Sequence, residues 1–198
     1  MDEQGPKGWY SRGYLPHFDG GEVPQMVTYC LADSIPALRI EEWQEQLRLL
    51  PDDRAKAILR RRIDRYLDGG HGRLVLRTPQ VAEVVQQALL HFDGDRYRLW
   101  AWVVMPNRVH VLCTPDRDHR LPDIVHSWKS FTAHAANRLL GRTGPFWRRD
   151  FWDRYARDAR HFDAAVSYIE WNPVRAGLCA GQEAWPFSSA NHRFRSEP

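Results

Sequence analysis

The segment from Trp100 to Thr114, Trp-Ala-Trp-Val-Val-Met-Pro-Asn-Arg-Val-His-Val-Leu-Cys-Thr, restricts the fold more than any other part of the chain. It predicts two β-strands separated by Met105-Pro106-Asn107. Side chains two positions apart on a strand point to the same face, so Arg108 and His110 project side by side while the valine between them enters a core. An apolar strand that starts with a basic residue and a histidine marks this face as a candidate functional site.

Strands interleaved with helices around this antiparallel centre predict a compact α+β fold. The predicted strands are Met26–Leu31, Tyr97–Val104 and Val109–Cys113, and a short extended piece is expected at Leu74–Leu76. The predicted helices are Glu41–Leu50, a second one capped by Pro51 to Asp53 and running to about Leu67, Thr78–His91, Leu121–Leu140 and His161–Asn172. Residues 146–155 are predicted to be irregular, and Pro173 is expected to end the last helix.

A chain of 198 residues with 43% hydrophobic residues can bury one sizeable core, so a single domain spanning residues 1–198 is predicted. Residues 1–25, rich in Gly and Pro, are expected to wrap its surface, with a core at 26–178 and a tail at 179–198. No apolar run approaches the ~18 residues that cross a membrane, and no signal pattern precedes the domain. Cys30, Cys113 and Cys179 are scattered, which suits a reducing cytoplasm.

The basic residues are concentrated in two segments and are nearly all arginines, with only three lysines among 28 basic residues. Residues 54–65 hold six basic side chains against one acid, and residues 129–160 hold eight against three. The planar guanidinium binds phosphate as a fork, which lysine cannot do, so this pattern favours phosphate binding. The alternative is that a GC-rich genome favours arginine codons and that these arginines merely lie on solvated helix faces.

Tyr168 and Asn172 lie four residues apart on the last predicted helix, one turn above the other, and can face His110 on the sheet. A tyrosine with a pKa of about 10 is a poor nucleophile unless a metal or a strong positive field neutralises the phosphate that it attacks. An amide oxygen suits Mg²⁺ and an imidazole suits Mn²⁺ as ligands. The alternative is an ordinary tyrosine at the core edge and an asparagine that caps the helix.

An ordered set of motifs resembles the REP-associated tyrosine transposases, relatives of the single-tyrosine HUH transposases. The matching segments are Arg12–Phe18, Val27–Ser34, Ala101–Asn107 with His110, Trp128–Ala133, Gly144–Trp147, Asp153-Arg154, Arg157-Asp158, Tyr168–Leu178 and Trp185–Ser189. The resemblance implies an HUH-type endonuclease domain with a ferredoxin-like or RRM-like antiparallel sheet packed with helices.

The same resemblance implies a mechanism. Tyr168 would attack a single-stranded DNA phosphate, leaving a 5′-phosphotyrosyl link and a free 3′-hydroxyl, and a second strand end would reverse the reaction. His110 and Asn172 would be two ligands of a divalent metal, Mg²⁺ or Mn²⁺. The substrates would be short palindromic hairpins of single-stranded DNA, without a small-molecule cofactor. The chain shows no pattern that decides between a monomer and a homodimer.

Several further residues are expected to contact the DNA, through charge or through base stacking. Those predicted to bind phosphate are Arg108, Lys129, Arg148, Arg149 and Arg154, and the other predicted DNA contacts are Arg12, Tyr14, Arg60, Arg61, Arg62, Trp147 and Trp152. For the residues around Trp147, a packed aromatic cluster under a solvated edge is an equal alternative. For Lys129, simple exposure to solvent is the alternative.

Arg108 stands where the HUH motif has its first histidine, and this departure affects the metal step. A guanidinium stays protonated and has no lone pair for a metal. Three outcomes remain open: another residue or water completes the metal site, Arg108 itself clamps the scissile phosphate, or cleavage is lost. The hypotheses are therefore a metal-assisted DNA transesterase, impaired or tolerant of Arg108, and a non-catalytic hairpin-binding protein derived from such a transposase.

Overall fold

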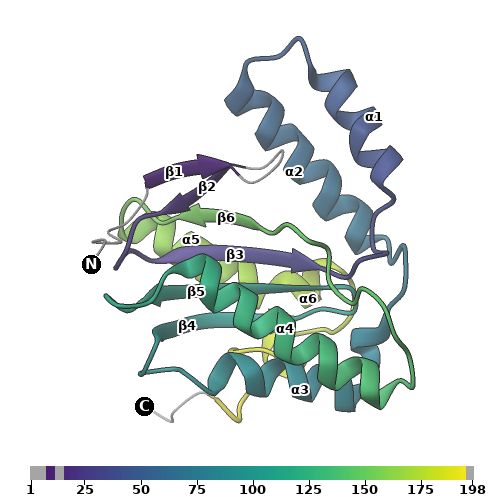
Figure 1. Cartoon of the computed structure of the whole chain (residues 1–198), viewed down its shortest axis with the longest axis vertical. Coiled ribbons are helices and arrows are strands. Elements are labelled where there is room, and N and C mark those ends of the chain that lie inside the picture. Colours follow the sequence, from purple (N-terminus) through teal and green to yellow (C-terminus); the bar gives the residue numbers. More distant parts are fainter. Residues whose placement is uncertain (1–7, 12–15, 195–198) are drawn as a thin grey trace.

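The alternating side chains of residues 108–113 lie at the centre of a four-stranded antiparallel sheet with the order β4-β5-β3-β6. The computed structural model describes residues 8–11 and 16–194. The strands of this sheet are β3 (Gln25–Cys30), β4 (Tyr97–Val104), β5 (Arg108–Pro115) and β6 (Trp152–Tyr155). Two short strands, β1 (Gly8–Ser11) and β2 (Pro16–Asp19), form a separate hairpin beside β6 (Figure 1).

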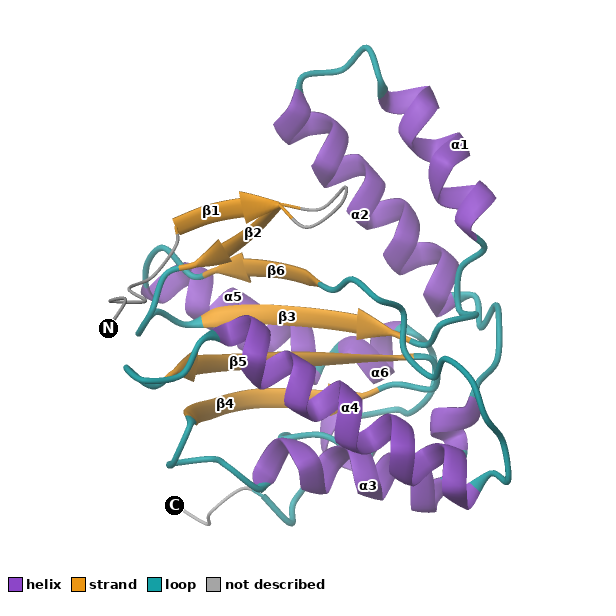
Figure 2. Cartoon of the chain, viewed as in Figure 1, coloured by secondary structure: helices purple, strands orange, loops and turns teal. Residues whose placement is uncertain are grey.

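Helices cover both faces of the sheet, as Figure 2 shows. One face is covered by α3 (Pro79–Leu90), which follows the 3₁₀ turn Val75–Arg77, and by α4 (Leu121–Leu139). The other face is covered by α5 (Ala159–Glu170), which is followed by the short helix α6 (Asn172–Arg175) and the 3₁₀ turn Gln182–Ala184. A helical hairpin of α1 (Ala37–Leu47) and α2 (Asp52–Asp68) packs at the end of β3 around a third apolar cluster.

The alternation along β5 divides its side chains between the two cores. Val109 and Val111 enter the larger core under α3 and α4, whereas Leu112 enters the smaller core under α5. Arg108 and His110 share the parity of Leu112 and therefore lie on the α5 face of the sheet. A register shift between Leu99 and Ala101 in β4 reverses the alternation there, so that these two residues enter different cores.

The predicted fold class is confirmed, because an antiparallel sheet packed with helices forms an α+β fold. The strand Tyr97–Val104 has the predicted bounds. The strand expected at Met26–Leu31 lies one residue earlier, and the helix expected at Leu121–Leu140 starts as predicted and ends one residue earlier. The second strand of the central pair is longer than the predicted Val109–Cys113, since pairing with both neighbours extends it.

Four predictions about local structure are wrong. The first helix starts directly after Pro36 rather than at Glu41, and the piece expected to be extended at residues 74–76 is a 3₁₀ turn. Residues 146–155 are not wholly irregular, because Trp152–Tyr155 pairs with β3. Pro173 does not follow the helix end: α5 stops at Glu170, and Pro173 occupies the first turn of α6, where its missing N–H is tolerated.

None of the helices within the described ranges has an apolar stretch long enough to cross a bilayer. Cys30, Cys113 and Cys179 are all free, and the first two are buried. The division of the chain into wrapping segment, core and tail stays a prediction.

Candidate functional site

Three elements bring the candidate residues together on the α5 face of the sheet. Strand β5 carries Arg108 and His110, and its register with β3 sets Thr28 directly opposite His110. Helix α5 crosses this face and carries Tyr168, whose ring meets the His110 ring edge-on at 5.4 Å between centroids. The chain turn after α5 brings Asn172, which is buried, to the same place.

Arg108 lies at the centre of this group, with its side chain only 1% exposed. Its guanidinium donates through Nε to His110 Nε2 at 2.9 Å and through Nη2 to Asn172 Oδ1 at 2.8 Å. Nη1 donates to Asn107 Oδ1 at 3.2 Å, and Nη2 also pairs with the Asp68 carboxylate at the end of α2. A buried charge is tolerable only when it is paired in this way. Because His110, Asp68 and Asn172 lie on β5, α2 and α6 respectively, Arg108 joins the sheet to both helices.

The bonds of Arg108 also determine the state of His110. Because the Arg108 Nε–H donates to Nε2, that nitrogen carries the lone pair, and the proton of the neutral ring sits on Nδ1. Nδ1 lies 2.8 Å from Thr28 Oγ1, which accepts a hydrogen bond from the Nδ1–H group. Burial and the neighbouring Arg108 charge hold the pKa of His110 well below its ordinary 6.5. His110 is therefore neutral at physiological pH.

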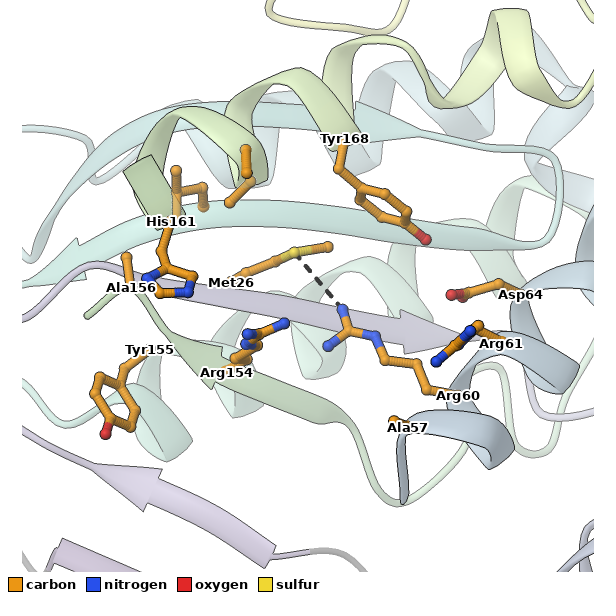
Figure 3. Close-up of a pocket in the computed structure, with 13 residues that line it drawn as sticks. Met26, Ala57, Arg60, Arg61, Asp64, Arg154, Tyr155, Ala156, His161 and Tyr168 are labelled. Carbon is orange, nitrogen blue, oxygen red and sulfur yellow. Dashed lines mark hydrogen bonds between the residues drawn. The ribbon is translucent and has the colours of Figure 1, made fainter. Parts of the chain in front are cut away.

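Tyr168 is half-buried, and its hydroxyl lies near the Asp64 carboxylate of α2 (Figure 3). Burial, followed by the Asp64 charge, raises the pKa of Tyr168 to about 12, although Arg60 and Arg108 act in the opposite direction. Burial likewise raises the pKa of Asp64 above its ordinary value, opposed by Arg60. Sequence reasoning counted Asp64 only as the single acid in a basic run.

The residues present do not fit a divalent metal. The two expected ligand atoms, His110 Nε2 and Asn172 Oδ1, both accept hydrogen bonds from the Arg108 guanidinium, which holds the space between them. A protonated guanidinium offers no lone pair and repels a cation. Among the described residues, no group of three His, Cys, Asp or Glu side chains is placed to hold a metal ion.

A cavity of about 400 Å³ opens beside the Tyr168 hydroxyl, between α2, β6 and α5. Arg60 and Arg61 line it from α2 and Arg154 from β6, and Asp64 lies next to the tyrosine (Figure 3). The sequence predicted these arginines as DNA or phosphate contacts in two separate segments. The structure brings them to one place with Tyr168, although their roles stay predictions.

The other predicted contacts lie elsewhere. Trp147 is buried, packs edge-on against Tyr29, and donates through Nε1 to Thr132 Oγ1 at 2.9 Å, which favours the packed-cluster alternative. Arg148 donates to the Ile35 carbonyl at 2.6 Å, and Lys129 donates to the Arg149 carbonyl at 2.7 Å.

A second cavity, of about 570 Å³, is lined by residues that include Trp147, Arg148, Arg149 and Trp152.

Arg62 and Lys129 line neither of these two cavities. Arg62 donates to Gln46 on α1 at 2.6 Å, and burial lowers the pKa of Lys129 to about 8. Arg12 and Tyr14 lie outside the described residues.

Sequence reasoning missed Asp64, Asp68 and Thr28. Arg60, Asp64 and Asp68 are spaced four residues apart, so they share one face of α2, and this spacing was a readable signal. Nothing local indicated that this face would meet Arg108 and Tyr168, because the contact joins residues 40 positions apart or more. Thr28 is identified only by the register of β3 against β5.

Comparison with known proteins identifies relatives of the chain, although no protein-family model matches it. The REP-associated tyrosine transposase of Escherichia coli (strain K12) is 30% identical over 113 residues, which are 54% of this chain and 63% of that protein. A Haemophilus influenzae relative named for the same family is 27% identical over 104 residues, covering 48% of this chain and 59% of its own length. The chain thus spans less than two thirds of either relative.

A solved structure of a REP-associated tyrosine transposase bound to a REP hairpin has the same fold, with a TM-score of 0.57 at 21% sequence identity. The match covers 96% of this chain and 82% of that one. The resemblance that the ordered motifs indicated is confirmed: this chain has REP-associated tyrosine transposases as relatives and shares their fold.

Proposed function

We propose that this chain binds palindromic hairpins of single-stranded DNA and cleaves and rejoins them through Tyr168. One observation carries the proposal: the Tyr168 hydroxyl points toward Asp64 at a cavity lined by arginines, and not into the apolar core (Figure 3). Positive charge beside the hydroxyl is what a tyrosine that attacks a phosphate requires. The relative of known structure carries a REP hairpin, which suggests the partner. Such a reaction on genomic DNA belongs in the cytoplasm.

The proposed reaction is a transesterification in which atoms and charges balance. Tyr168 Oη forms a bond to the phosphorus of one DNA phosphodiester, and the bond from that phosphorus to the 3′-oxygen breaks. The proton of the tyrosine ends on the released 3′-oxygen through solvent, so a 5′-phosphotyrosine and a free 3′-hydroxyl result. Attack by another 3′-hydroxyl reverses these changes and rejoins the strand. No step passes through a metal, because the residues present do not fit one.

A second candidate function is hairpin binding without cleavage. It is favoured by Arg108, whose guanidinium takes both expected ligand atoms and is itself buried. In this candidate, Tyr168 is a packing residue at the DNA surface, and the arginines bind the backbone without chemistry.

A gel assay for a covalent protein–DNA adduct separates the two candidates. The probes are labelled single-stranded hairpins from the palindromic repeats of the source genome, incubated with Mg²⁺, with Mn²⁺ or with EDTA. The matched control for Tyr168→Phe is Tyr66→Phe, which removes the hydroxyl of a half-buried tyrosine that stacks on His71 outside the cavity. An adduct that Tyr168→Phe abolishes and Tyr66→Phe keeps supports cleavage.

The remaining outcomes are equally informative. Hairpin binding without an adduct in the wild type supports the second candidate, and an adduct that then appears in Arg108→His with Mn²⁺ shows that Arg108 had removed the activity. Failure of the wild type to bind any hairpin overturns both candidates.

A further inference from the structure

We propose that Arg60, Arg61 and Arg154 hold the DNA backbone phosphate next to Tyr168, and that this site takes its positive charge from these arginines instead of from a divalent metal. The inference rests on the proposed function, since it names the residues that receive the DNA strand at the same site. It adds a binding site for one phosphodiester and a reaction that does not depend on metal ions.

Arg108 is not available for this role. Its side chain is 1% exposed, and its donors are engaged by His110, Asn107, Asn172 and Asp68. A phosphate could reach the guanidinium only after these bonds break. The charge of Arg108 is also offset in part by the Asp68 carboxylate that it contacts. The positive charge that meets a phosphate must therefore come from other residues.

The cavity beside Tyr168 supplies such residues from two elements. In Figure 3 the guanidinium groups of Arg60 and Arg154 extend toward each other across it, and the Tyr168 hydroxyl lies on one side. Arg60 Nη2 donates to the thioether sulfur of Met26 at 3.6 Å. Because a thioether is a weak acceptor, a phosphate oxygen would replace it readily.

The charges around the cavity favour an anion. Three arginines face one carboxylate, Asp64, among the described residues that line it. His161, on the α5 side, forms an ion pair with Asp158 at 2.9 Å when it is protonated. Guanidinium groups on opposite sides of the cavity can each donate hydrogen bonds to different oxygens of one phosphate. A volume of about 400 Å³ lies within the range of ligand sites.

The inference is tested by a double-mutant cycle between protein and DNA that does not depend on cleavage. Hairpins in which one phosphate at a time is replaced by a neutral methylphosphonate are bound to the wild type, to Arg60→Ala and to Arg154→Ala. The control is Arg39→Ala, an exposed arginine that pairs with Glu42 on α1. At one phosphate position, neutralisation is expected to weaken binding by the wild type and to have little further effect on the two cavity variants.

Each cavity variant is expected to reduce the slope of log affinity against log salt by about one, as for one lost phosphate contact, and Arg39→Ala is not. If the wild type forms the covalent adduct, the adduct should form equally in Mg²⁺ and in EDTA. It should fall about 100-fold in Arg154→Ala, the order found when one electrostatic donor is removed from an active site.

The outcomes distinguish this inference from the proposed function. Hairpin binding with coupling at one phosphate supports the phosphate site, whether or not an adduct forms. Hairpin binding without coupling to Arg60 or Arg154 overturns the phosphate site and leaves hairpin binding intact. An adduct that requires Mg²⁺ overturns the metal-free part. A wild type that binds no hairpin overturns both proposals.

Discussion

Replacing Arg108 by methionine tests whether one buried guanidinium joins the sheet to α2 and α6. The variant keeps an unbranched side chain in the space but leaves three buried acceptors without their donor. His110, Asn107 and Asn172 are 0%, 1% and 4% exposed, so water does not replace the lost bonds easily. Asp68, 36% exposed, recovers hydration and costs less.

The expected loss of stability follows from these exposures. Leaving a buried polar group without its partner costs about 1–3 kcal/mol, and breaking a buried ion pair by removing one partner costs about 3–5 kcal/mol. We therefore expect Arg108→Met to lower the free energy of unfolding by about 3–5 kcal/mol. That is a large part of the ~5–15 kcal/mol that stabilises a typical domain.

Urea denaturation followed by tryptophan fluorescence measures this difference, since the chain has nine tryptophans. The matched control is Arg48→Met, which removes an exposed pair with Glu45 in which the arginine side chain is 68% exposed. Such a surface pair contributes at most about 1 kcal/mol. A loss below about 1 kcal/mol for Arg108→Met, with an unchanged m-value, would refute the structural role assigned to the guanidinium.

Four other predictions concern the same region. Because burial and Arg108 lower the pKa of His110, the unfolded chain binds a proton below pH 6.5 that the folded chain does not. The free energy of unfolding of the wild type should therefore fall by about 2 kcal/mol from pH 7 to pH 5, relative to that of His110→Gln. Urea titration at each pH measures this difference. Asp64→Asn should lower the pKa of Tyr168 from about 12, read as the absorbance difference from the same variant carrying Tyr168→Phe; an unchanged titration would contradict the Asp64 contact. Arg108→His should gain thermal stability in Mn²⁺, by about 2.7 kcal/mol at 100 times the dissociation constant, whereas the wild type should gain none. Trp147→Ala should lose about 3–5 kcal/mol in chemical denaturation, because the indole is part of the core; a loss confined to DNA affinity would contradict this.

Local periodicity predicts much of this fold because the alternation of side chains along each central strand can be read from a few consecutive residues. The alternation around His110 identified both the strand and the face on which it lies, and the strand Tyr97–Val104 was recognised by the same rule. The register shift at Leu99 was not predicted, since it depends on pairing with β5 and not on composition. The four-residue strand at Trp152 was missed because it is short, charged and at the sheet edge.

The site was less predictable than the fold for the same reason. Tyr168, His110 and Asn172 were found together through motif and helical spacing, but Asp64 and Asp68 come from a helical hairpin whose direction no local pattern determines. Trp147 illustrates the opposite error, since an aromatic residue beside two arginines has the same sequence pattern whether it stacks on a base or fills a core. Only the contact with Tyr29 and the bond to Thr132 favour the second interpretation.

An arginine at the first position of the His-hydrophobic-His pattern changes how charge can be supplied to this site. Arg108 is paired with the Asp68 carboxylate, which offsets part of its positive charge. A single uncompensated guanidinium about 4 Å from a phosphate contributes about 4 kcal/mol at an effective dielectric constant near 20. Three arginines against the single carboxylate of Asp64 at the cavity would therefore provide an attraction that the buried Arg108 cannot. If this chain cleaves DNA, the positive charge that stabilises the phosphate must come from the cavity arginines. Arg108 instead joins β5 to α2 and α6 through His110, Asp68 and Asn172.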